Sequence, residues 1–128
     1  VNLDIFDHVS RSFFSYIGER TKSPYYHGLG FGDLNGDGRT DVLEKEGWYE
    51  APAEPLKAGN WNFHRYQFAP AGGAQMLVFD IDGDGDNDVV SSTAAHSWGL
   101  AWFENQKREG RITFKKHRKK FQYSKLAE

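Results

Sequence analysis

Two nine-residue stretches of the chain carry oxygen-bearing side chains at one shared spacing, and cation binding is the chemistry that this spacing suggests. The first stretch is DLNGDGRTD, residues 33–41, and the second is DIDGDGDND, residues 80–88. Each has Asp or Asn at positions one, three, five and nine and Gly at position six. Carboxylates crowded in this way repel one another, and no apolar core would tolerate them without a neutralising partner.

A hard divalent cation would supply that partner. Calcium takes about six to eight oxygen ligands at about 2.3–2.6 Å, and a tight turn can curl the backbone so that positions one, three and five converge on it. Position seven would add its backbone carbonyl, and Gly at position six permits the sharp bend. The predicted ligands are Asp33, Asn35, Asp37, Arg39 (carbonyl) and Asp41 for the first site, and Asp80, Asp82, Asp84, Asp86 (carbonyl, with an additional charge) and Asp88 for the second.

The donor set favours Ca²⁺ over other metals. Zinc and copper prefer Cys or His ligands, and Mg²⁺ demands a smaller, near-octahedral shell. A helix-flanked EF-hand is the nearest rival, because Glu44 stands at position twelve of the first stretch. Three glycines precede that stretch in HGLGFG, and Ser91 stands at position twelve of the second, so we expect strands on both sides.

The stretches belong to a longer internal repeat. GFGDLNGDGRTDVL parallels LVFDIDGDGDNDVV, GWYEAP parallels AWFENQ, and WNFHRYQF parallels ITFKKHRKKF, in the same order. Each unit of about 50 residues reads as four short strands, which is typical of a propeller blade. The sequence therefore predicts an all-β fold of about two blades of four antiparallel strands plus an N-terminal strand segment, incomplete as a closed propeller.

We divide the single partial domain, residues 1–128, into an N-terminal segment (1–22), a first repeat (23–72) and a second repeat (73–123). A blade has two faces that each need a neighbour, so two blades leave apolar faces open at both ends. We expect either a fragment of a longer propeller or a chain that associates with a protein partner or with itself through those faces. A head-to-tail contact of this kind would close as a ring or continue as a filament.

The stretches HGLGFGDLNGDGRTDVL, GGAQMLVFDIDGDGDNDVV and AAHSWGLAWFENQ are similar to those of the FG-GAP or VCBS repeat family, across about residues 20–126. The resemblance is strongest to large secreted bacterial propellers. It implies calcium loops between the first two strands of each blade, with Asp33, Asn35, Asp37 and Asp41 in one ligand set and Asp80, Asp82, Asp84 and Asp88 in the other. It also implies an extracellular or periplasmic setting and a role in adhesion, ligand binding or scaffolding.

The net charge and composition of the chain argue against several classes of function. The net charge is −2, so no overall field favours nucleic acid, although basic residues concentrate from Lys107 onward. The chain has no Cys, no apolar run long enough to span a membrane and no visible signal peptide. No acid–base pair or nucleophilic triad can be assigned, so we predict a protein that is not an enzyme, with a polysaccharide lyase-type activity of a larger parent as an alternative.

Histidine and tryptophan residues offer further candidate sites. His64 and His117 occupy matching repeat positions, which predicts structural hydrogen bonds, and Trp48 and Trp102 match as inter-blade core. Trp98 is the better candidate for contact with a ligand such as a carbohydrate. His27 and His96 are further candidates for ligand contact, although a role in ordering loops is the preferred interpretation of both. The leading interpretation is a calcium-binding extracellular propeller module for interaction or assembly; the alternatives are a lectin-like module, a scaffold of a polysaccharide-active enzyme and a subunit of a surface fibre.

Overall fold

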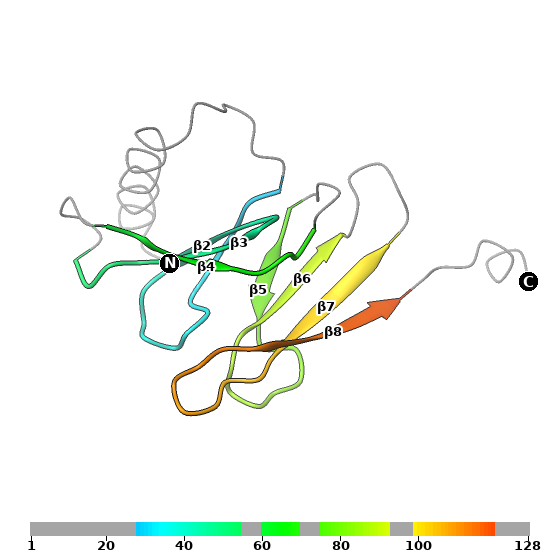
Figure 1. Cartoon of the computed structure of the whole chain (residues 1–128). Helices are drawn as coiled ribbons and strands as arrows, with labels where there is room; N and C mark the ends of the chain where they lie inside the picture. Colours follow the sequence, from blue (N-terminus) through cyan, green and yellow to red (C-terminus); the bar gives the residue numbers. More distant parts are fainter. Residues whose placement is uncertain (1–27, 55–59, 70–74, 93–98, 120–128) are drawn as a thin grey trace, which may run out of the picture.

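The computed structural model describes residues 28–54, 60–69, 75–92 and 99–119, and these residues form an all-β structure (Figure 1). Its eight strands make two four-stranded antiparallel sheets with the orders β1-β2-β3-β4 and β5-β6-β7-β8, and neither sheet closes into a barrel. The strands are β1 (Gly30–Gly32), β2 (Asp41–Glu44), β3 (Gly47–Glu50), β4 (Asn62–Arg65), β5 (Leu77–Phe79), β6 (Asp88–Ser92), β7 (Leu100–Asn105) and β8 (Phe114–Lys119). This confirms the predicted all-β class, with four antiparallel strands in each repeat.

Each Asp-rich stretch is the connection between the first two strands of its sheet. We call residues 33–41 the first loop and residues 80–88 the second loop. Gly32 pairs with Asp41 at the end of the first hairpin, and Phe79 pairs with Asp88 at the end of the second. Both loops lie at the same end of the sheets, next to the turn between β7 and β8 (Figure 1). The N-terminal segment 1–22 lies outside the described residues, and the repeat boundaries at 23, 72 and 123 stay predictions.

The two sheets pack against each other through an aromatic-rich core. Strand alternation directs Leu43 and Trp48 of the first sheet and Val89 and Phe103 of the second towards one shared cluster. Phe68, which follows β4, packs edge-on against Phe103 with ring centroids 5.1 Å apart. Large aromatic rings therefore supply much of the area buried between the sheets.

Glycines in β1 allow the sheets to approach closely. A Cβ atom on Gly30 would lie 2.7 Å from Cβ of Met76, and one on Gly32 would lie 2.6 Å from Cβ of Val78. Strand β5 therefore packs directly over the backbone of β1. At the matching positions of the second repeat stand Leu77 and Phe79, whose side chains are 51% and 48% exposed.

The outward faces of the two sheets differ. On the first sheet, Val42 and its neighbours Ala51 and Trp61 are buried. On the second sheet, Phe79 and Leu100 are exposed and border a hollow of about 440 Å³ that Trp102 and His117 also line. The predicted open apolar face is therefore present on the second sheet, whereas the outward residues Val42, Ala51 and Trp61 of the first sheet are buried.

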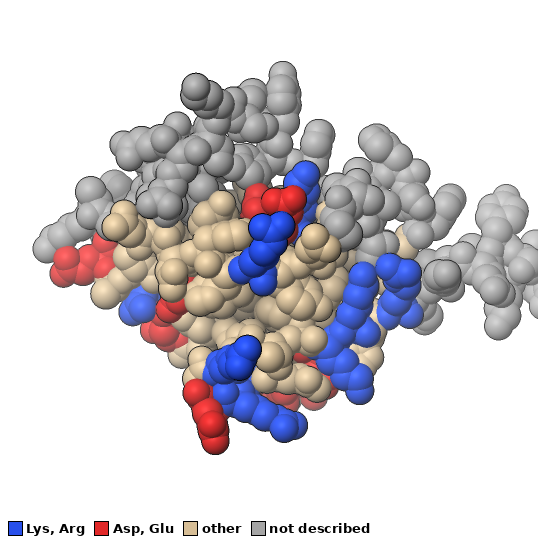
Figure 2. All heavy atoms as spheres, in the orientation of Figure 1, with Lys and Arg blue, Asp and Glu red and all other residues tan. Residues whose placement is uncertain are grey.

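Charge is unevenly spread over the surface. Figure 2 shows Lys and Arg side chains over the outer edge of the second sheet, where β8 lies. Among the residues of β8 whose side chains are described, Lys115, Lys116 and Arg118 are basic and exposed. Within the described ranges, no helix has the length and apolar character needed to cross a membrane.

Candidate metal centre

The Asp at position nine fixes each loop to its sheet. Asp41 and Asp88 are fully buried. One oxygen of Asp41 accepts a hydrogen bond from the backbone N–H of Leu34 at 2.8 Å, and the other accepts from Ala51 at 2.9 Å. Asp88 does the same with Ile81 at 2.9 Å and Asn105 at 2.8 Å. Hydrogen bonds to an ionised carboxylate are among the stronger ones in proteins, so these two residues join each loop to the third strand of its sheet.

The Asp at position one shapes the interior of each loop. Oδ1 of Asp80 accepts from the N–H of Gly83 and Oδ2 from that of Gly85, both at 2.9 Å. These hydrogen bonds, first of all the one from Gly85, lower the pKa of Asp80. Asp33 accepts from Gly36 at 2.8 Å and from Gly38 at 2.7 Å in the first loop.

Glycine at position six is required by the backbone conformation. Gly38 has φ 84° and Gly85 has φ 94°, which lie in the left-handed region that residues with a Cβ rarely adopt. A tight turn at this position brings the preceding and following carboxylates to one side. The sequence-based reason for Gly at position six is therefore confirmed.

Three carboxylates of the second loop converge. Oxygens of Asp80, Asp82 and Asp88 lie within 4.8 Å of one another, in a group that could hold a metal ion. Partial desolvation in the loop, followed by repulsion from Asp88 and Asp84, raises the pKa of Asp82 to about 6. An all-oxygen donor set with unbalanced negative charge fits a hard divalent cation.

The first loop balances more of its charge internally. Nη2 of Arg39 lies 2.7 Å from a carboxylate oxygen of Asp37. The amide of Asn35 at position three donates to Oε1 of Glu50 at 3.0 Å. Burial, and then repulsion from Asp37 and Asp33, raises the pKa of Asp41 to about 6. Among the residues that the structure describes, three acidic groups converge only in the second loop.

The remaining predicted ligands hold the turns of the loops. Oδ1 of Asp37 accepts from the N–H of Arg39 at 2.8 Å, and Oδ1 of Asp84 accepts from that of Asp86 at 2.9 Å. These bonds turn the chain at position five in both loops. The expected contribution of the carbonyls of Arg39 and Asp86 stays a prediction.

A Trp–His–Glu arrangement occurs in both sheets. Trp48 stacks on His64 with ring centroids 4.2 Å apart, and Nε2 of His64 lies 2.8 Å from Oε2 of Glu50. The matching residues Trp102, His117 and Glu104 repeat this geometry at 4.3 and 3.2 Å. The hydrogen bonds predicted for His64 and His117 are therefore present in the structure. Sequence reasoning missed the glutamates, although both occupy matching places two residues after the tryptophan.

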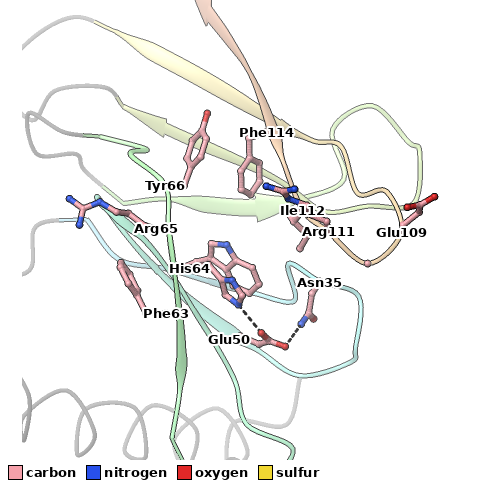
Figure 3. Close-up of a pocket in the computed structure, with 12 residues that line it drawn as sticks. Asn35, Glu50, Phe63, His64, Arg65, Tyr66, Glu109, Arg111, Ile112 and Phe114 are labelled. Atoms are coloured by element: carbon pink, nitrogen blue, oxygen red, sulfur yellow. Dashed lines mark hydrogen bonds and ion pairs between the residues drawn. The ribbon is translucent and has the colours of Figure 1, made fainter.

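A cleft of about 600 Å³ opens between the outer strands of the first sheet and the β7–β8 turn (Figure 3). Glu50 lies inside the cleft between His64 and Asn35 (Figure 3). Its hydrogen bond with Asn35 links the wall of the cleft to the first loop. Arg111 and Phe114 line the opposite wall. Trp48 is only 4% exposed, which confirms its predicted place in the core between the sheets, whereas Trp102 lies on the open face.

The three residues predicted to contact a ligand, His27, His96 and Trp98, lie outside the described residues. Their proposed role stays a prediction.

Comparison with models of known protein families gives no match to this sequence, and comparison with curated proteins gives none either. The fold and the site therefore define the class of protein by themselves: an all-β protein of two packed four-stranded sheets, with an acidic loop that could hold a metal ion.

Proposed function

We propose that the chain is a calcium-stabilised part of an FG-GAP or VCBS-type β-propeller that acts in extracellular or periplasmic interaction or assembly. The observation that carries this proposal is the convergence of Asp80, Asp82 and Asp88 at the end of the second sheet. Calcium there would offset the repulsion between the carboxylates and hold the first and second strands of the blade together. The first loop, with fewer unbalanced charges, would be a second and weaker calcium site.

The role of the ion in this proposal is structural. Extracellular modules bind Ca²⁺ with dissociation constants on the order of 10⁻⁴–10⁻³ M, which suits loops that are partly open to solvent. A partner protein, or a second copy of the chain, would then bind to the assembled sheets.

Chelation tests the proposal. Excess EGTA should lower the melting temperature of the purified chain, added Ca²⁺ should restore it, and elemental analysis should find the metal before chelation. Added Mg²⁺ should restore it less well, because Mg²⁺ demands a stricter geometry. An unchanged melting temperature, together with a preparation free of metal, would contradict a structural role for calcium.

Carbohydrate binding is the second candidate, and the cleft beside the first loop is the observation that favours it. The cleft combines aromatic surface from Tyr66 and Phe114 with the charged groups of Glu50 and Arg111. Arg111→Ala should abolish binding in a glycan array if this function is correct. Arg108→Ala removes a nearby charge that does not line the cleft and is the matched control.

A further inference from the structure

Side chains of the second repeat hold the first loop through its backbone. Nδ2 of Asn87 donates to the carbonyl of Asp33 at 2.8 Å. Nδ2 of Asn105 donates to the carbonyl of Leu34 at 3.0 Å, and Nζ of Lys107 donates to that of Asn35 at 2.5 Å. Three consecutive carbonyls at the start of the first loop are therefore bound from a part of the chain more than 50 residues away.

Asn105 also connects this contact to the second loop. Its backbone N–H donates to Oδ1 of Asp88, which is one of the three converging carboxylates, and its side chain donates to the carbonyl of Asn87 as well as that of Leu34. Asn105 is 1% exposed, so its hydrogen bonds are not replaced by water. A direct path therefore runs from Asp88 through Asn105 to the first loop.

In the described part of the first repeat, this path has no equivalent. Ala51 matches Asn105, and its backbone N–H makes the same bond to Asp41, but its methyl group can donate to nothing further. The local bond between the position-nine Asp and the third strand is thus common to both repeats, whereas the link to a neighbouring loop is specific to the second.

We infer that Asn105, with Asn87 and Lys107, is a positioning residue that holds the first loop in its ligand-binding shape, so that the two loops bind cations cooperatively. This inference rests on the proposed function for its cation, although the backbone contacts exist without one. A cation in the second loop restrains Asp88 and Asn105, and the first loop is then ordered at a smaller entropic cost. By linkage, a cation in the first loop raises the affinity of the second by the same factor.

The test follows each loop separately by NMR during a Ca²⁺ titration, with the amide signals of Gly36 and Gly38 reporting the first loop and those of Gly83 and Gly85 the second. Asn105→Ala places at 105 the residue type that the first repeat already tolerates at 51. It should weaken binding at the first loop about three- to tenfold, the effect of losing one buried hydrogen bond. Intrinsic binding at the second loop, measured with the first disabled by Asp33→Asn, should change less than about twofold, because the backbone bond to Asp88 is retained.

Two further variants keep the test decisive. Lys107→Met removes an exposed side chain, and the loss of its positive charge would by itself favour a cation at the first loop, so this variant is read without metal. In EGTA, amide hydrogen exchange at Gly36 should be faster in Lys107→Met than in the unaltered chain, even if Asn105→Ala fails to fold. Gln106→Ala removes the side chain between them, which donates a hydrogen bond to Glu104, and should leave Ca²⁺ binding at both loops unchanged. Equal weakening of Ca²⁺ binding at both loops in Asn105→Ala, or unchanged Ca²⁺ binding at the first loop in that variant, would overturn the inference, as would unchanged exchange in Lys107→Met.

A metal-free measurement separates this inference from the proposed function. In EGTA, amide hydrogen exchange at Gly36, Asp37 and Gly38 should be faster in Asn105→Ala than in the unaltered chain, because the loop has lost a tertiary anchor. If neither loop responds to Ca²⁺ but this exchange difference is present, the proposed function fails and the positioning role holds. If both loops respond to Ca²⁺ and exchange is unchanged, the positioning role fails.

Discussion

Asp88 performs two tasks with one carboxylate. It closes the second loop by accepting hydrogen bonds from two backbone N–H groups, and it supplies an oxygen to the acidic cluster. Asp41 makes the same backbone bonds in the first loop, where Arg39 and Lys107 lie close to the loop as positive groups. The two loops therefore share their backbone shape and differ in the charge left over for a cation.

Loss of a ligand should cost more in the second loop than in the first. Asp82→Ala removes a charged oxygen donor, whereas Asn35→Ala removes a neutral one, so we expect Asp82→Ala to weaken calcium binding by about tenfold or more, or about 1.4 kcal/mol, and Asn35→Ala to weaken it less. Isothermal titration calorimetry of both variants measures this ranking. A larger loss for Asn35→Ala would refute the charge argument.

The turn of each loop was predictable from spacing, because its hydrogen bonds are local: position one accepts from position six, and position nine accepts from position two. The residues elsewhere in the chain that form hydrogen bonds to the loops were not predictable. Asn105 and Leu34 are 71 positions apart, and only the packing of the two sheets brings them together. The replacement of Ala51 by Asn105 at matched repeat positions was the visible sign of this contact.

At the scale of elements, the repeat predicts the order of strands in each sheet. It does not predict which face of one sheet packs against which face of the other. The stretches GFG and LVF occupy matching first strands and read equally well as strand sequences. Gly30 and Gly32 face β5 in the structure, and the missing side chains are what permits that approach. Alternation predicts which residues share a face, but it does not tell which face meets the neighbouring sheet.

Gly32→Ala should therefore destabilise the contact between the sheets. The new methyl group would lie 2.6 Å from Cβ of Val78, and overpacking of this kind typically costs about 1–3 kcal/mol. Denaturant unfolding measures the loss. Phe79→Ala alters the matching position of the second repeat, where the side chain is 48% exposed, and should change the free energy of unfolding far less. Equal stability of Gly32→Ala and the unaltered chain would contradict the close approach.

For the whole molecule, the open face of the second sheet is the surface on which association would occur. Leu77, Phe79 and Leu100 are each more than 40% exposed, and apolar groups gathered in this way commonly mark interaction sites. Sequence reasoning anticipated such a face from the number of repeats. Which of the two outward faces would remain uncovered depended on tertiary packing.

Self-association through this face can be measured directly. Light scattering after gel filtration should give a particle heavier than the 14.6 kDa chain at high protein concentration, and the double variant Leu77→Asp, Phe79→Asp should return it to the single-chain mass. Asp substitutions at the exposed positions of β8 are the control, since they change charge without altering the apolar face. A single-chain mass for the unaltered protein at every concentration would rule out this route of assembly.

The absence of side chains at Gly30 and Gly32 also fixes the order in which the two repeats can follow each other along the chain. Because Leu77 and Phe79 fill the corresponding space on the second unit, a duplicate of that unit appended after it could not nest at the spacing seen between the first pair. A third repeat added by tandem copying could pack in the same way only if residues 77 and 79 were both replaced by glycine. The addition of repeats to this architecture therefore depends on the absence of side chains at these two positions rather than on the cation loops.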